Sequence, residues 1–108
     1  MTLWRRWVFA VQAPSDEFQR HFERGLTLRG VHVEPADHFA FMARALGARA
    51  FVGIAWAAEG LEVTVKLKGG LFASPKGLER LLLESGRDAQ ARLLPGGPPG
   101  RLQGDVAP

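Results

Sequence analysis

Four side chains that commonly bind metal ions lie close together in the sequence: His32, Glu34, Asp37 and His38. Imidazole nitrogens and carboxylate oxygens together suit zinc, manganese or iron. Their spacing follows no established metal-site signature, such as two histidines one helical turn apart. Glu34 and Asp37 also stand where acidic residues stabilise the start of a helix. A metal-dependent enzyme that uses these four residues is one hypothesis, and a helix start flanked by two surface histidines is the other.

Groups for covalent catalysis are scarce. The chain has no cysteine, which excludes disulfides, thiolate metal sites and a cysteine nucleophile. No nucleophile-elbow motif surrounds Ser15, Ser74 or Ser85. The pair Gly69 and Gly70 lacks the glycine spacing of a phosphate-binding loop. We therefore assign no catalytic residue, expect no cofactor and favour a protein that is not an enzyme.

A second group of residues has the chemistry of a nucleic-acid interface. An aromatic ring beside cations can stack on an unpaired base while the cations neutralise phosphates. Trp4 and Arg6 alternate on one face of an expected strand, and Lys66 and Lys68 alternate on one face of another. The four residues form one surface only if both strands present these faces on the same side of the sheet. In that arrangement single-stranded RNA or DNA is the alternative partner; otherwise the lysines belong to a solvated strand face.

Large apolar side chains are numerous for so short a chain, and they carry the prediction that we favour. They are Trp4, Trp7, Phe41, Phe51, Trp56 and Phe72. In the expected strand, Phe51 and Trp56 point to opposite faces, so one small core does not bury every ring. Surplus rings of this kind line a ligand pocket or fill a subunit interface. We therefore expect a non-catalytic, homodimeric binding or interaction module whose partner is a small molecule or another protein.

Apolar spacing and the positions of glycine and proline predict four strands and three helices in one α+β domain. Strict alternation is clearest at 61–68. The expected strands are 3–12, 26–33, 50–58 and 61–68, and the expected helices are 14–24, 35–46 and 75–94. The order is β-α-β-α-β-β-α. This order predicts a small sandwich in which helices pack on a mixed or antiparallel sheet.

Composition sets the remaining limits. A length of 108 residues fits a single α+β domain, 1–94, followed by a Pro/Gly-rich tail, 95–108, that we expect to be disordered. The formal net charge of +3 is a small surplus for a nucleic-acid binder. The absence of Asn and Cys is typical of a heat-adapted, thermophile-like composition. Because no targeting signal or membrane-length apolar stretch is present, we expect a cytoplasmic location and no membrane partner.

Overall fold

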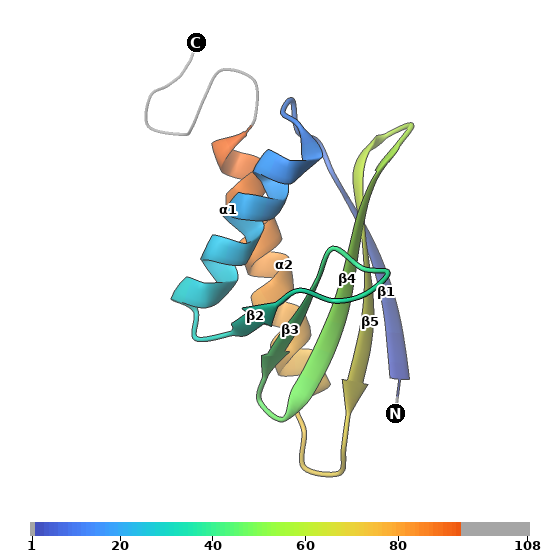
Figure 1. The fold of residues 1–108 in the computed structure, drawn as a ribbon, viewed down its shortest axis with the longest axis vertical. Helices are drawn as coiled ribbons and strands as arrows, with labels where there is room; N and C mark the ends of the chain where they lie inside the picture. The colour runs from blue at the N-terminus through green and yellow to red at the C-terminus, as the bar shows by residue number, and fades with distance from the viewer. Residues whose placement is uncertain (1, 94–108) are drawn as a thin grey trace.

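Residues 2–93 are described by a computed structural model, and they form one antiparallel sheet with two helices against one of its faces (Figure 1). The elements are β1 (Thr2–Phe9), α1 (Ser15–Leu28), β2 (His32–Glu34), β3 (Phe41–Ala45), β4 (Ala48–Ala57), β5 (Gly60–Gly69) and α2 (Pro75–Arg92). The strand order across the sheet is β1-β5-β4-β3-β2, which places the last strand beside the first. The predicted α+β architecture is confirmed, and the predicted tail, 95–108, lies outside the described residues.

The helix predicted at 35–46 is wrong, because this part of the chain forms a loop and strand β3. Phe41 and Ala43 are both buried in the core, and the strand pairs with β4 as an antiparallel hairpin. Leu46 and Gly47 form the hairpin turn, with φ angles of 56° and 74°. Positive φ at two consecutive residues is the geometry of a two-residue β-turn and is incompatible with a helix. Gly47 therefore turns a hairpin, whereas the sequence pattern indicated the end of a helix.

Helix α1 continues past Gly25, where we expected it to end, as far as Leu28. The strand predicted at 26–33 is correspondingly reduced to β2. Gly25 is buried where α1 crosses α2, and a Cβ atom there would lie 3.3 Å from the Cβ atom of Ser85. The missing side chain therefore lets the two helices approach closely, a role that the sequence does not distinguish from a helix stop.

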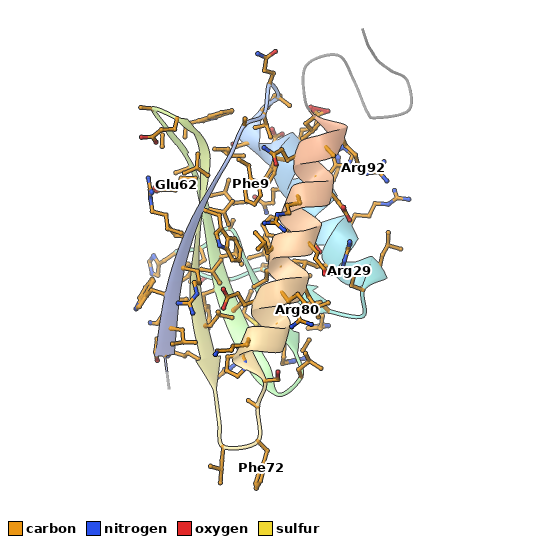
Figure 2. All side chains as sticks on the ribbon, turned by 180° about the vertical axis from the view of Figure 1, so that it is seen from behind. Phe9, Arg29, Glu62, Phe72, Arg80 and Arg92 are labelled. Atoms are coloured by element: carbon orange, nitrogen blue, oxygen red, sulfur yellow. The ribbon has the colours of Figure 1, made fainter. Side chains whose placement is uncertain are left out.

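The core lies between the two helices and the sheet. Its largest members are Phe9, Phe18, Phe22 and Phe41, and successive ring centroids are 5.5, 5.6 and 5.4 Å apart. In Figure 2 Phe9 points from β1 toward α2, whereas Glu62 of β5 lies on the side of the sheet away from α2. Burial of one sheet face under both helices leaves the opposite face without a helical cover.

Helix α2 begins as its sequence predicted. The Ser74 hydroxyl accepts a hydrogen bond from the backbone N–H of Gly77 at 3.2 Å, and Pro75 occupies the first turn. Further along, Gly86 faces the ring of Phe9, where a Cβ atom would lie 2.7 Å from Cζ. This glycine makes room for an aromatic core residue. Neither helix in residues 2–93 combines the length and hydrophobicity needed to cross a bilayer.

Candidate nucleic-acid interface

The sheet face away from the helices, here called the open face, is defined by strand alternation. Alternate residues of β5, from Leu61 to Leu67, are fully buried under the helices, so the residues between them point the other way. Directly paired residues point to the same side of a sheet, and the pairing therefore extends the open face to the other strands. Its members are Thr2, Trp4, Arg6 and Val8 of β1, Glu62, Thr64, Lys66 and Lys68 of β5, Arg49, Phe51, Gly53 and Ala55 of β4, Met42 and Arg44 of β3, and His32 and Glu34 of β2.

One row of paired residues across the open face alternates aromatic rings with a cation. Trp4 is paired with Lys66, and Lys66 is paired on its other side with Phe51. The Lys66 ammonium lies 5.5 Å from the centre of the Trp4 ring, and the Lys68 ammonium lies 6.0 Å from the centre of the Phe51 ring. Trp4 is 61% exposed. The row thus presents an accessible ring with positive charge beside it.

A neighbouring row contains three consecutive cationic side chains. It runs from Thr2 through Lys68, Arg49 and Arg44 to His32. Within residues 2–93, neither Lys68 nor either arginine of this row has a carboxylate within ion-pair distance. These three side chains are therefore free to meet the charge of an anionic partner.

The remaining charges of the open face are partly neutralised. Arg6 forms an ion pair with Glu62, and His32 hydrogen-bonds Glu34 at 2.8 Å. Lys66 has no carboxylate partner within the described chain. The two acidic residues of the open face are thus held beside basic ones, and the surplus of charge on this face is positive.

Two hollows adjoin the aromatic row. The first has a volume of about 370 Å³ and is lined by Thr2, Arg49 and Lys68 together with three glycines. The second, of about 430 Å³, lies over β4 and β5 and includes Gly53 and Thr64. The first hollow offers two cations to a phosphate, and the second has a mixed polar and apolar lining that includes the Phe39 ring.

The loop between β2 and β3 forms one wall of the second hollow, through His38 and Phe39. The Phe39 ring lies 5.4 Å from the ring of Phe51, and the backbone N–H of Ala40 donates a hydrogen bond to the carbonyl of Val52 at 2.8 Å. These contacts fix the loop against the open face. The sequence analysis did not assign Phe39 to any site. The helix predicted at 35–46 placed this residue on a helix, whereas it lies in a loop beside the open face.

The condition for the predicted nucleic-acid surface is met. Trp4, Arg6, Lys66 and Lys68 lie on adjacent strands and on the same side of the sheet. Arg44 and Arg49 extend the surface and were missed by the sequence analysis. The alternation of side chains in β4 was the signal that could have identified Arg49. Apolar residues occur on both faces of that strand, and they obscured the alternation.

The six aromatic residues named as candidates for a ligand pocket or a subunit interface lie at several different places. Trp4 and Phe51 share the open face, whereas Phe41 is buried in the core and Trp7 packs against the core from β1. Trp56 is 54% exposed near the end of β4, and Phe72 lies in the loop between β5 and α2. Among these six, only Trp4 and Phe51 are brought together as candidate ligand contacts.

The predicted metal ligands are only partly brought together. His32 and Glu34 are neighbours on the open face, as their hydrogen bond shows. Asp37 and His38 lie in the loop that follows β2. Across residues 2–93, no group of three histidine, cysteine, aspartate or glutamate side chains is arranged to hold a metal ion. The expected helix start at Pro35 is absent as well, because no helix begins there.

The open face combines features that suit contact with a flat, anionic partner. It offers ring surface, unpaired cations and two adjoining hollows, and its carboxylates are held beside basic side chains. Comparisons of the chain with known protein families, with curated proteins and with solved structures find no match. The functional assignment therefore rests on this geometry.

Proposed function

We propose that the protein binds single-stranded RNA or DNA across the open face of its sheet. The observation that carries the proposal is the aromatic row, in which Lys66 lies between Trp4 and Phe51. Bases of a single strand stack on such rings, and ammonium and guanidinium groups meet the phosphates. In a duplex the bases already stack on each other, so exposed rings on a sheet favour an unpaired strand.

The spacing of the two rings lets them contact two different nucleotides of one strand. Trp4 and Phe51 are separated by the strand β5, which corresponds to about 10 Å across the sheet. A strand of nucleic acid that places one base on Trp4 and another beside Phe51 runs across the sheet, past Arg49 and Lys68. The second hollow then receives a base, and the first lies where a phosphate passes.

Charge also argues against a second copy of this chain as the occupant of the open face. Two copies packed through this face would bring Arg44, Arg49, Lys66 and Lys68 of each subunit toward those of the other. Like charges opposed across an interface oppose association. A polyanion meets the same residues with favourable charge.

Fluorescence anisotropy with labelled oligonucleotides of about 12 residues tests the proposal. Trp4→Ala should lower affinity for the single strand roughly 5- to 150-fold, the range given by about 1–3 kcal/mol for base stacking on a ring. Trp56→Ala is the matched control, because it removes an exposed tryptophan outside the open face. Binding that is absent at low salt, or equal losses from both substitutions, would contradict the proposal.

A homodimeric interaction module, which the sequence favours, is the second candidate. Its support is apolar surface away from the open face, at Trp56, Leu71 and Phe72. A cytoplasmic location and a small-molecule or protein partner belong to the same prediction. Native mass spectrometry tests it: a mass of twice 11.8 kDa supports a dimer, and a monomer at micromolar concentration argues against it.

A further inference from the structure

One end of the molecule carries three exposed apolar side chains on two loops that contact each other. We call Leu46, Leu71 and Phe72 the apolar tip; they are 53%, 90% and 96% exposed. Figure 1 shows the loop between β5 and α2 projecting beyond the sheet at this end, and in Figure 2 Phe72 stands at its extremity. Single exposed apolar residues are ordinary on protein surfaces, but Leu71 and Phe72 are consecutive and almost fully exposed, which marks a contact surface with Leu46 at its edge.

The tip is held in a defined turn. The backbone N–H of Ser74 donates to the carbonyl of Leu46 at 2.9 Å, and the N–H of Ala73 donates to the carbonyl of Gly70 at 3.2 Å. Leu46 adopts a positive φ angle of 56°, a conformation that costs a leucine free energy. Leu46 therefore takes the left-handed position that the β3–β4 hairpin turn requires, and its side chain, which is about half exposed, lies close to Gly77 at the start of α2.

Cations lie on the elements that adjoin the apolar tip. Lys76 and Arg80 lie in the first turns of α2 directly after the loop, and both are exposed. Arg49 and Lys68 line the hollow that also includes Gly47 and Gly70, next to the tip residues in the chain. Glu79, the acidic residue in the first turns of α2, is paired with Arg5 at 2.9 Å. Projecting apolar side chains with a basic surround are the pattern of a protein that inserts a loop into an anionic lipid surface.

We propose that the apolar tip docks on the surface of an anionic phospholipid bilayer, with Leu71 and Phe72 entering the interface and the cations meeting the headgroups. This inference goes beyond the proposed function and does not depend on it. It revises the expectation of no membrane partner. That expectation rested on the lack of a membrane-spanning segment, and such a lack does not bear on binding to a membrane surface. Because Arg49 and Lys68 serve both surfaces, anionic membrane and nucleic acid should compete.

Vesicle sedimentation tests the proposal with phosphatidylcholine vesicles that contain or lack phosphatidylserine. The protein should bind the anionic vesicles, and the double substitution Leu71→Ser/Phe72→Ser should lower the partition coefficient at least tenfold, as loss of apolar insertion requires. The double substitution Lys76→Gln/Arg80→Gln should weaken binding to anionic vesicles severalfold. Trp56→Ser is the matched control and should change neither result.

The absence of cysteine allows one fluorescent label to be placed at will. An environment-sensitive dye on Gly70→Cys should shift to the blue with anionic vesicles, because open space surrounds this position at the base of the tip. The same dye on Glu59→Cys, in the turn between β4 and β5, should not shift. Equal shifts at both positions, or no sedimentation with anionic vesicles, would overturn the proposal. Equal binding to neutral vesicles, or a tip substitution that instead abolishes a dimer, would overturn it as well.

Discussion

The salt dependence of oligonucleotide binding offers a quantitative test of which cations contact phosphates. The perturbation is removal of charge from Arg49, Lys66 and Lys68, singly and together, by substitution with glutamine. Together with Arg44 these are the open-face cations that lack a carboxylate partner within residues 2–93. Each phosphate contact of a single strand contributes about 0.7 to the slope of log K against log salt.

Four such contacts give a slope of about −2.8 for the natural sequence, so that raising salt from 50 to 200 mM weakens binding about 50-fold. Each single substitution should reduce the slope by about 0.7. The triple variant retains Arg44, so its slope should be about −0.7 and the same change in salt should weaken its binding only about threefold. The expected effect is therefore a change in slope as well as a loss of affinity at low salt.

The assay is anisotropy of a labelled single strand titrated with protein at four salt concentrations. Arg24→Gln is the matched control, because it removes the same charge from an exposed position on α1. Its slope should equal that of the natural sequence. If Arg24→Gln changed the slope as much as Lys66→Gln does, the binding would depend on net charge and the assignment of the open face would be refuted.

Two further predictions concern the core that supports the open face. Gly86→Ala should destabilise the fold by about 1 kcal/mol despite the higher helix propensity of alanine, because the new methyl group meets the ring of Phe9. Urea unfolding followed by circular dichroism measures the change in the free energy of unfolding. An increase in stability would contradict this prediction. Ser85→Ala should leave stability unchanged or raise it by up to about 1 kcal/mol, because the buried Ser85 hydroxyl has no hydrogen-bond partner in the described residues. A loss of more than 1 kcal/mol for Ser85→Ala in the same experiment would show that the hydroxyl has a partner.

Alternation in the two strands with polar faces was enough to predict most of the candidate site. In β5 every second side chain is buried, and in β1 exposed side chains alternate with less exposed ones, so the faces that carry Trp4 and Lys66 followed directly from the sequence. What the sequence did not contain was the adjacency of these strands, because β1 and β5 are brought together by pairing between residues far apart in the chain. The shared surface therefore depended on tertiary pairing.

The failure at 35–46 has a physical cause. Phe39, Met42, Ala43 and Leu46 are spaced as on a helix, and a strand of similar composition is hard to distinguish from a helix by spacing alone. The turn gave a weak signal, because Leu46 occupies a left-handed position at which asparagine or glycine is usual. Reading β3 as a helix then concealed Arg44 as a member of the open face.

Chemical-shift mapping by two-dimensional ¹H–¹⁵N NMR, with unlabelled single-stranded oligonucleotide added to ¹⁵N-labelled protein, tests the central assignment most directly. The open face predicts that the largest changes fall on the Trp4 indole N–H and on the amides of Phe51, Lys66 and Lys68, while α1 and α2 change little. Changes concentrated on the helices, with these four residues unmoved at saturation, would contradict the assignment of nucleic-acid binding to the open face.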